Sequence, residues 1–570
     1  MGVLGNRSLA SFDALIVGSG AGGSAAACKL TAAGKKVLVL EAGDNKFPGL
    51  DDAAPDMPIS LYSNDELKHS IRHFDRMDPL VEPRTFRASA DAAAEANEDV
   101  CAMSRTVGGT AVHADMKYPR FNEIDFRLAS ALRAAGREYP GTSFEDWPLA
   151  YFDLEPFYGE AEMLSGVAGA DSGPDADPFA SLRGTPYPLP PSPPMYVGLV
   201  LAEGARRAGY NPFSYPAAIN SRPYDGRPAC VNCGLCSGYG CPNNSKGSPA
   251  VTTLRRALLS RNCQLRFNAF VTRLRTDAAR RRVVGVDYVD DEGNVQSATA
   301  DHFILAANAP ESVRLCLLSD PDGPGLGNSS GQLGRHIMFH YQTVAVGIFR
   351  QRMHGERGQA VTTGMSDFRG VLEGGSSLAP DRPLGGIVEF GTSSEPITAA
   401  KNNLTAIEFA RALGNSTTLR RLTLESPFHA RLGALIMQAE DAPQPTNRVD
   451  LDPAVRDAMG LPVVRLTYRN HPFELEAADF YKPRMVEILR RAGAQYGFVA
   501  PPDPIPRSRH PMGGLRMGTD PQTSVCDPFG KFHDLDNLYC MDGGVMVTGS
   551  GYNPTLTLIA LALRSAAALA

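Results

Sequence analysis

Three glycines near the start of the chain have the spacing of a dinucleotide-binding loop. Gly18, Gly20 and Gly23 follow the apolar residues 13–17 and open an alanine-rich segment. In such a loop the first glycine allows a tight turn, the second lets the backbone approach a pyrophosphate, and the third lets a helix pack on a strand. Glu41 follows after about 20 residues, where an acidic side chain accepts hydrogen bonds from ribose hydroxyls. The pattern predicts a dinucleotide site, and a structural glycine-rich turn is the alternative.

The C-terminal part of the chain holds a second group of polar side chains in glycine-rich surroundings. His510 begins the run His-Pro-Met-Gly-Gly-Leu-Arg-Met-Gly, and Asp542 and Gly543 lie in the turn that follows a predicted strand. Asn553 precedes Pro554, which we place at or near the first position of a helix, where proline costs least. A histidine titrates near neutral pH and can exchange protons there. The alternatives are a loop-capping His510 and an Asn553 that only caps its helix.

Four of the ten cysteines lie within one short, glycine-rich segment. They follow the pattern C-x2-C-x2-C-x4-C and comprise Cys230, Cys233, Cys236 and Cys241. The last gap is one residue longer than in the ferredoxin pattern C-x2-C-x2-C-x3-C-P, whose thiolates hold an iron–sulfur cluster. Structural zinc sites usually separate two C-x2-C pairs by a longer stretch. The segment predicts an iron–sulfur cluster or a set of free thiols, with zinc as a third alternative.

Length and composition describe a large folded protein. The chain has 570 residues, of which 43% are hydrophobic and 21% charged, as in soluble globular proteins. Its net charge of −6 argues against nucleic-acid binding. No apolar run approaches the roughly 20 residues that span a bilayer, and residues 1–12 lack the apolar core of a signal peptide. We expect a cytoplasmic protein without a membrane span, and export bound to a partner that carries the signal is the alternative.

The glycine loop has the local pattern of a β-α-β unit. Residues 13–17 and 36–41 predict short buried strands on either side of a helix that Gly34 ends. Residues 47–97 are polar and irregular, and predict a surface excursion. Other predicted elements are helices near 124–134 and 154–164 and strands near 343–349, 383–390 and 435–440. The later strands predict an antiparallel sheet.

Motifs at both ends of the chain together resemble the glucose-methanol-choline (GMC) oxidoreductase family. They are the N-terminal glycine loop, the Val-Gly-Gly-Thr run that contains Gly108, Gly109 and Thr110, the segment 306–312, and the C-terminal runs that begin at His510 and Asn553. The similarity extends from the first strand to the last helix. Residues 146–148, 220–228 and the cysteine segment are most similar to the catalytic subunit of bacterial FAD-dependent glucose dehydrogenases, with pyranose oxidases more distant.

The resemblance implies an α/β fold with two domains. A discontinuous Rossmann-like FAD-binding domain would carry an antiparallel-sheet substrate-binding domain covered by helices. The expected FAD-binding segments are 1–165 with the excursion 47–97, 216–334 with the cysteine loop 230–241, and 501–570. Residues 166–215 would form a boundary loop and part of the substrate domain, and residues 335–500 the rest of it. The implied FAD contacts are Gly18, Gly20, Gly23, Glu41, Gly108, Gly109, Thr110, His113, Asp542, Gly543, Asn553, Pro554 and Thr555.

The implied reaction is oxidation of an alcohol CH–OH group to a carbonyl by hydride transfer to flavin N5. His510 would be the base, since imidazole has a pKa near the operating pH, and Asn553 would orient the alcohol oxygen. The helix after Asn553 would place its positive end toward the flavin pyrimidine. His113 lies where some relatives attach the flavin covalently. The alternative is a packed histidine beside a non-covalent flavin.

The implied electron acceptor depends on the cysteine segment. In the resembled dehydrogenases a cluster on such a loop passes electrons to a protein acceptor or small partner subunit. Bare thiols would favour an oxidase that reduces O₂, and a non-catalytic flavin-fold scaffold is a third alternative. The expected substrate is a sugar, a glycoside or another polyol. The apolar segment 334–341 departs from the family pattern and makes a larger aromatic or apolar alcohol the rival.

Overall fold

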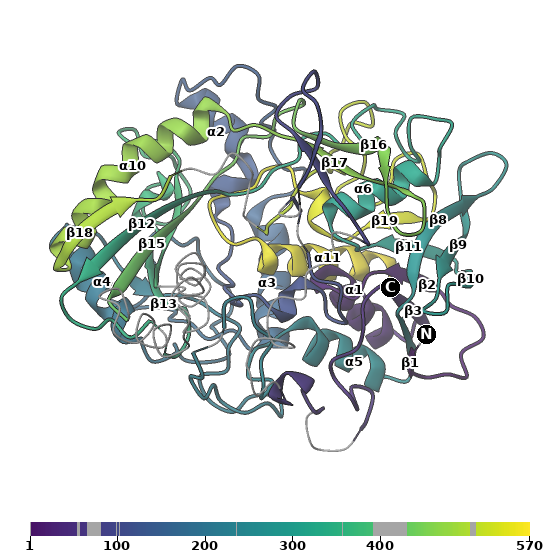
Figure 1. Ribbon diagram of the computed structural model, residues 1–570, viewed down its shortest axis with the longest axis horizontal. Helices are drawn as coiled ribbons and strands as arrows, with labels where there is room; N and C mark the ends of the chain where they lie inside the picture. The colour runs from purple at the N-terminus through teal and green to yellow at the C-terminus, as the bar shows by residue number, and fades with distance from the viewer. Residues whose placement is uncertain are drawn as a thin grey trace, which may run out of the picture.

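The computed structural model describes residues 2–53, 58–64, 81–97, 100–101, 103–234, 236–355, 357–391, 430–501 and 509–570. Parts of the predicted segments lie outside the described residues: 54–57 and 65–80 of the excursion, 98–99 and 102 after it, 235 of the cysteine loop, 356 and 392–429 of the substrate-binding domain, and 502–508 of the C-terminal FAD-binding segment. Two large sheets organise the described chain, and they lie on opposite sides of the view in Figure 1.

The first large sheet carries the glycine loop. Its strands lie in the order β1, β7, β3, β2, β11, β19, and β1 runs antiparallel to β7 whereas the other neighbours are parallel. Their bounds are β1 Gly2–Gly5, β2 Ala14–Val17, β3 Val37–Glu41, β7 Cys263–Phe267, β11 His302–Leu305 and β19 Leu538–Cys540. The strand order reverses beside β2, so the carboxyl ends of β2 and β11 border a crevice of the kind that binds dinucleotides.

Helices from distant parts of the chain pack together beside this sheet. α1 (Ala21–Ala32) contacts α5 (Thr253–Leu259) and α11 (Thr555–Leu569), and α3 (Tyr151–Ser165) packs on α11. α11 runs through the middle of the molecule in Figure 1. The predicted helices near 124–134 and 154–164 are confirmed as α2 (Leu128–Ala134), preceded by a 3-10 turn, and α3. α6 (Ala309–Leu318) follows β11.

The second large sheet is antiparallel and has helices on one face. Its order is β18, β12, β15, β14, β13, β6, with bounds β6 Phe213–Ser214, β12 Tyr341–Phe349, β13 Val361–Met365, β14 Gly386–Gly391, β15 Leu432–Ala439 and β18 Ala494–Val499. α4 (Tyr196–Arg207) and α10 (Pro472–Arg491) cover it on the left of Figure 1. Along β12, buried Thr343 and Ala345 alternate with less buried Gln342 and Val344, as the two faces of a strand require. The predicted strands and helix-covered sheet are confirmed.

Two smaller sheets complete the fold. β8 (Phe270–Thr276), β9 (Val283–Val289) and β10 (Val295–Ala298) form an antiparallel meander. β4 (Thr85–Arg87) and β5 (Glu95–Ala96) join β16 (Arg448–Arg456) and β17 (Pro462–Thr467), where β4 pairs parallel to β17. The expectation of irregular surface chain is therefore wrong at β4. Thr85 donates to Asp452, and Arg87 donates to Thr467, so partners far along the chain hold this strand in place.

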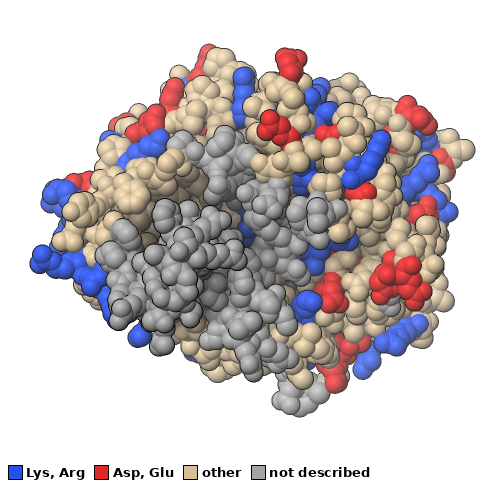
Figure 2. Space-filling view, viewed as in Figure 1, with Lys and Arg blue, Asp and Glu red and all other residues tan. Residues whose placement is uncertain are grey.

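The distribution of charged side chains on the surface agrees with the net charge of −6. In Figure 2 the acidic and basic side chains of the described residues are interspersed over the visible face, without a basic patch. Among the described residues, no helix has the length and apolar character needed to cross a bilayer.

Candidate active site

The glycine loop has the geometry that a bound pyrophosphate needs. Gly18 adopts a φ of +99°, and a Cβ there would lie 2.4 Å from the Ala306 carbonyl oxygen. A Cβ on Gly23 would lie 2.1 Å from the Gly18 oxygen, so this glycine lets α1 pack against the loop. A Cβ on Gly20 would meet nothing closer than the Gly109 Cα at 3.9 Å. The backbone at Gly20 is therefore open to a ligand, while the other two glycines shape the turn.

The first turn of α1 adds a favourable electrostatic environment. Gly20 is its N-cap residue, no side chain caps the helix, and no acidic residue lies in its first turn. Unpaired N–H groups and the positive helix end suit the phosphates of a dinucleotide. Gly22 was not among the predicted site residues, yet a Cβ there would lie 1.7 Å from the Met541 carbonyl oxygen. The sequence does show two adjacent glycines here, but only the tertiary contact with Met541, the residue after β19, explains the need for Gly22.

Glu41 joins the glycine loop to its neighbours. One of its carboxylate oxygens accepts hydrogen bonds from the Ser19 backbone at 2.9 Å and the Ser19 hydroxyl at 2.7 Å, and the other accepts one from Gly43 N–H at 2.8 Å. Ser19 Oγ in turn accepts from Gly108 N–H at 3.0 Å. Glu41 and Ser19 thus connect the glycine loop at Gly18 to the loop at Gly108 and fix their relative position. Ser19 was not predicted from the sequence.

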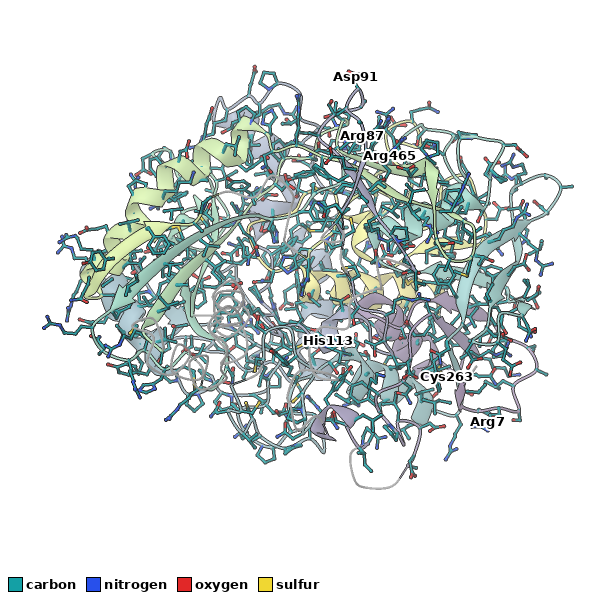
Figure 3. The ribbon with its side chains drawn as sticks, viewed as in Figure 1. Arg7, Arg87, Asp91, His113, Cys263 and Arg465 are labelled. Carbon is teal, nitrogen blue, oxygen red and sulfur yellow. The ribbon has the colours of Figure 1, made fainter. Side chains whose placement is uncertain are left out.

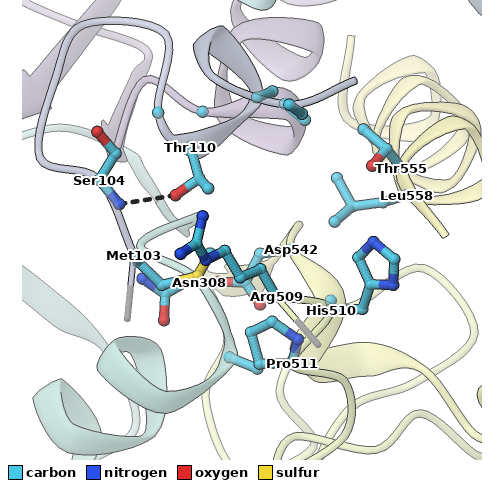
Figure 4. Close-up of a pocket in the computed structure, with 18 of the residues that line it drawn as sticks. Met103, Ser104, Thr110, Asn308, Arg509, His510, Pro511, Asp542, Thr555 and Leu558 are labelled. Carbon is cyan, nitrogen blue, oxygen red and sulfur yellow. Dashed lines mark hydrogen bonds between the residues drawn. The ribbon is translucent and has the colours of Figure 1, made fainter. Parts of the chain in front are cut away.

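A cavity of about 540 Å³ connects these loops with the C-terminal motifs. Most of the predicted site residues line it: Gly18, Gly20, Glu41, Gly109, Thr110, His113, His510, Asp542, Gly543, Asn553, Pro554 and Thr555. Gly23 and Gly108 do not line it, because they pack the loops behind its wall. Figure 4 shows Thr110, Asp542, Thr555 and His510 around this space.

The loop opposite the first glycine motif is held by its own hydrogen bond. Thr110 Oγ1 accepts from Ser104 N–H at 2.9 Å, which Figure 4 marks. Gly108 and Gly109 have φ values of +93° and +65°, so both need glycine or strain. His113 follows the 3-10 turn after Gly109 and lies near the centre of Figure 3, with its ring centroid 5.5 Å from that of Tyr62.

Asp542 lies two residues after β19, at the cavity wall. Its carboxyl accepts hydrogen bonds from the Ser312 hydroxyl at 2.5 Å and from Gly544 N–H at 2.8 Å. Burial raises the pKa of Asp542 despite these bonds. Ser312 lies on α6, so Asp542 fixes the carboxyl end of β19 against that helix.

His510 lies against a second histidine, His340, which stands in the apolar segment 334–341 and was not a predicted site residue. The two Nδ1 atoms are 2.9 Å apart, and the rings meet edge to face with centroids 5.0 Å apart. His340 Nε2 lies 3.2 Å from the Gly549 carbonyl oxygen. Burial, His340 and Lys117 together hold the pKa of His510 well below its ordinary value. His510 is therefore neutral at neutral pH, as a proton acceptor must be.

Asn553 is bonded at both ends of its amide. Its oxygen accepts a hydrogen bond from the Tyr215 hydroxyl at 2.5 Å, and its Nδ2 donates to Glu389 Oε1 at 3.1 Å. α11 begins at Thr555 with Pro554 as the N-cap residue, and no side chain caps it. The alternative of Asn553 as a simple N-cap is therefore wrong. The partners of Asn553 fix which end of the amide carries oxygen.

Lys117 extends this network along the cavity. Its ammonium lies 2.6 Å from Glu389 and 3.0 Å from Asp115. Burial opposes the charge, but Asp115 and Glu389 raise the pKa of Lys117 above its ordinary value. Gln438 Nε2 lies 3.5 Å from Glu389 Oε1, and Gln342 Nε2 donates to Gln438 Oε1 at 3.1 Å. All these groups line the cavity beside His510 and Asn553.

The apolar segment 334–341 does not face the cavity. Ile337, Met338 and Phe339 are at most 1% exposed and belong to the core that also contains the first large sheet. Tyr341 packs with the helices over the second sheet. The sequence argument for an apolar substrate therefore loses its basis, because these side chains are core residues.

The cysteine loop borders the cavity through residues that lie between its cysteines. Ser237 and Gly238 line the wall, and Gly238 N–H donates to the His113 carbonyl oxygen at 3.0 Å. Cys233 is exposed, whereas Cys236 is buried and burial raises the pKa of its thiol. Within the described part of the chain, no group of three or more His, Cys, Asp or Glu side chains is arranged to hold a metal ion. The iron–sulfur cluster therefore stays a prediction.

Comparisons with known proteins agree with this geometry. Residues 195–342 and 443–562 match the N- and C-terminal parts of the GMC oxidoreductase family, and residues 16–50 match an NAD(P)-binding Rossmann-like domain. The gluconate 2-dehydrogenase flavoprotein of Pantoea cypripedii is 26% identical over 100% of this chain and 95% of its own length. The fructose dehydrogenase large subunit of Gluconobacter japonicus is 27% identical over 98% of both chains.

Solved structures show the same fold. Pyridoxine 4-oxidase from Mesorbium loti superimposes with a TM-score of 0.61 and 18% sequence identity, over 98% of each chain. The glycine loop, the cavity and the two matched segments all point to one family. The chain belongs to the GMC oxidoreductase family.

Proposed function

We propose that this protein is an FAD-dependent dehydrogenase that oxidises a CH–OH group of a hydroxyl-rich substrate, such as a sugar, a glycoside or another polyol, to a carbonyl. One observation carries the proposal: a single cavity joins the open backbone of Gly20 to His510 and Asn553. We assign FAD binding to the segments 1–165, 216–334 and 501–570, and substrate binding to 335–500 with part of 166–215.

FAD, when bound, supplies the acceptor for the hydride that leaves the alcohol carbon. The residues of the chain do the rest. His510 accepts the hydroxyl proton, and its low pKa keeps it unprotonated and ready. Asn553 keeps one amide hydrogen beyond the one used by Glu389, and this hydrogen can hold the alcohol oxygen. The uncapped end of α11 adds a positive dipole end, with no acidic residue in its first turn.

The walls beside the catalytic pair favour a hydroxyl-rich substrate. Glu389, Gln438 and Gln342 form a row of hydrogen-bonding groups across three strands of the second sheet, and Lys117 lies at one end of that row. The remaining donors and acceptors of these groups can pair with several hydroxyls at once, and an apolar substrate would leave them without those partners at a free-energy cost. Gluconate and fructose, in the names of the two relatives, are both polyhydroxylated.

Anaerobic reduction of the bound flavin tests the proposal. FAD-loaded protein is mixed with sugars, glycosides, polyols and aryl alcohols, and bleaching of the flavin is followed in a stopped-flow instrument. We expect His510→Ala to slow reduction by the best substrate by about 10²–10⁴-fold. The control is His533→Ala, whose ring contacts Ser524. A rate within about threefold of wild type in His510→Ala would exclude His510 as the base.

We propose a protein electron acceptor or small partner subunit rather than O₂, because one relative is named as a large subunit. No step is assigned to the cysteine loop. Iron and acid-labile sulfide in anaerobically purified protein test the cluster directly: a stoichiometric amount would confirm that prediction. Rapid reoxidation of the reduced flavin by air would instead show an oxidase.

The attachment of the flavin is a separate question about His113. This residue lines the cavity and is 1% exposed, so a flavin in the cavity has His113 in its wall. We propose it as the residue of attachment if the flavin is covalent. Acid precipitation distinguishes the two forms, because a covalent flavin stays with the pellet in the wild type and is released in His113→Ala.

A further inference from the structure

The second histidine of the site, His340, has no part in the chemistry described above. It precedes β12, and its ring lies between His510 and the loop before Asn553. The side chain is 2% exposed, so its ring nitrogens need hydrogen-bond partners within the protein and cannot rely on bulk water. Both nitrogens have protein partners, and this determines where the protons of the pair lie.

A carbonyl oxygen can only accept a hydrogen bond. His340 Nε2 must therefore carry its proton to donate to the Gly549 oxygen at 3.2 Å. In a neutral imidazole the other nitrogen is then an acceptor. Burial, with Arg369 nearby, lowers the pKa of His340 to about 4, so the ring is neutral at neutral pH. Its Nδ1 is consequently a lone pair directed at His510.

The shared contact then fixes the tautomer of His510. Two Nδ1 atoms 2.9 Å apart need one proton between them, and His340 cannot supply it. His510 must carry the proton on Nδ1, which leaves its Nε2 with the lone pair. Only a nitrogen with a free lone pair can accept the hydroxyl proton of a substrate.

The loop that carries Gly549 packs against a buried cluster of ionisable side chains. Arg369 pairs with Asp125 and with Glu440, all 0% exposed, and Ser550 Oγ donates to Asp125 at 2.9 Å. A Cβ on Gly549 would lie 3.7 Å from Glu440 Oε1 and 3.9 Å from the His340 ring, so this loop is packed on both sides. The acceptor of His340 is therefore fixed in position.

We propose that His340 is a positioning residue that keeps the proton of His510 on Nδ1 and so presents Nε2 as the basic nitrogen to the substrate. The inference rests on the proposed alcohol oxidation. When His510 takes the hydroxyl proton it becomes an imidazolium with two N–H groups, and the Nδ1–H keeps its acceptor on His340. Lys117 and Arg369 also face the pair and oppose this positive charge, with Glu389 and Glu440 beside them.

Two substitutions separate this role from packing. His340→Leu removes the acceptor at similar size, whereas His340→Asn places an amide oxygen near the position of Nδ1. His336→Asn is the matched control: His336 is 3% exposed, lies four residues earlier, and its ring contacts Ser143 and Gln332 instead. Asparagine also tolerates the φ of +60° at that position.

We expect His340→Leu to slow flavin reduction about 10–100-fold with KM within about threefold of wild type, and His340→Asn to recover most of that rate. His336→Asn should leave the rate unchanged. Equal rate losses in all three variants, or no recovery in His340→Asn, would overturn the assignment in favour of a packing role.

A second readout needs no substrate. Long-range ¹H–¹⁵N spectra of histidine-labelled protein report the tautomer of each ring, and the His510 signals are assigned from their absence in His510→Gln. We expect a proton on Nδ1 in wild type and His340→Asn and a shift toward Nε2 in His340→Leu. A wild-type proton on Nε2 would refute the positioning role. Failure of every alcohol to reduce the flavin would refute the proposed function and leave this result intact.

Discussion

Glu389 accepts a hydrogen bond from the Asn553 amide at 3.1 Å and thereby ties the second sheet to the start of α11. Its other oxygen lies 2.6 Å from Lys117 Nζ. The carboxylate is 1% exposed and is shared between a charge and a hydrogen-bond donor. The orientation of Asn553 therefore depends on the salt bridge between Lys117 and Glu389.

The salt bridge between Lys117 and Glu389 gives the first prediction. Glu389→Gln leaves Lys117 with Asp115 as its remaining anionic neighbour, and Lys117→Met leaves two carboxylates without their shared cation. We expect each single variant to lower the free energy of unfolding, and the double variant to lose less than the sum, with a coupling of about 0.5–3 kcal/mol. Chemical denaturation of the four proteins measures it. Strict additivity would show that the pair does not interact.

Tyr215 gives the second prediction. Tyr215→Phe removes the donor to Asn553 Oδ1 while keeping the ring, so the amide loses its orientation. We expect flavin reduction to slow by about two- to tenfold, since one buried hydrogen bond contributes about 0.5–1.5 kcal/mol. Tyr158→Phe is the control, because its buried hydroxyl contacts Thr557 farther along α11. The idea fails if both variants show the same rate change.

Two neighbouring glycines give the third prediction. A Cβ on Gly20 would meet no atom of the chain closer than 3.9 Å, but it would occupy the ligand side of the loop. A Cβ on Gly22 would instead overlap the Met541 carbonyl oxygen at 1.7 Å. We expect Gly20→Ala to keep the apoprotein fold and to weaken FAD binding. Gly22→Ala should lower the melting temperature of the apoprotein. Differential scanning fluorimetry with and without FAD distinguishes the two effects, and unchanged FAD affinity in Gly20→Ala would contradict the loop assignment.

The depressed histidine pKa values give the fourth prediction. Since burial, His340 and Lys117 lower the pKa of His510, the acid limb of kcat/KM should lie below pH 6.5, about the pKa of an ordinary histidine. A pH series of flavin reduction checks this. An acid limb at or above 6.5 would mean that His510 is not the group that titrates.

The same shifts affect stability. Burial, Arg516 and Arg335 lower the pKa of His336 to about 3, and that of His340 is about 4, so the unfolded chain binds more protons than the folded one between those values and 6.5. These residues therefore destabilise the fold as pH falls through that window. Removing one in His336→Asn should make the loss of stability between pH 6.5 and 4 smaller than in wild type. Denaturation at both pH values measures the difference.

Buried acids act in the opposite direction. Burial raises the pKa of Glu440 to about 8 and that of Asp441 to about 7, so their stabilising contribution falls as pH rises from their unfolded values toward these folded ones. The overall profile is the sum of both sets. The comparison between His336→Asn and wild type isolates the histidine part, because the acids are common to both proteins.

Local sequence patterns were sufficient for the strand, turn and helix of the glycine loop. Gly18 and Gly23 have the roles that their spacing predicts, because each depends on neighbours within a few residues or on the adjacent strand. The motifs around His510 and Asn553 likewise indicated side chains that line one cavity. The error at β4 came from a pairing with β17, which no local pattern contains.

The sequence by itself determined the family, the dinucleotide loop and the two residues proposed for proton transfer and alcohol binding. Only the tertiary structure decided what surrounds them. His340 is 170 residues from His510, and Tyr215 is 338 residues from Asn553, so neither contact leaves a periodic or spaced signal in the chain. The apolar neighbours of His340 looked like a substrate wall, yet they are core residues. Strand alternation places successive side chains on opposite faces, and only the packed sheet shows which face meets the cavity.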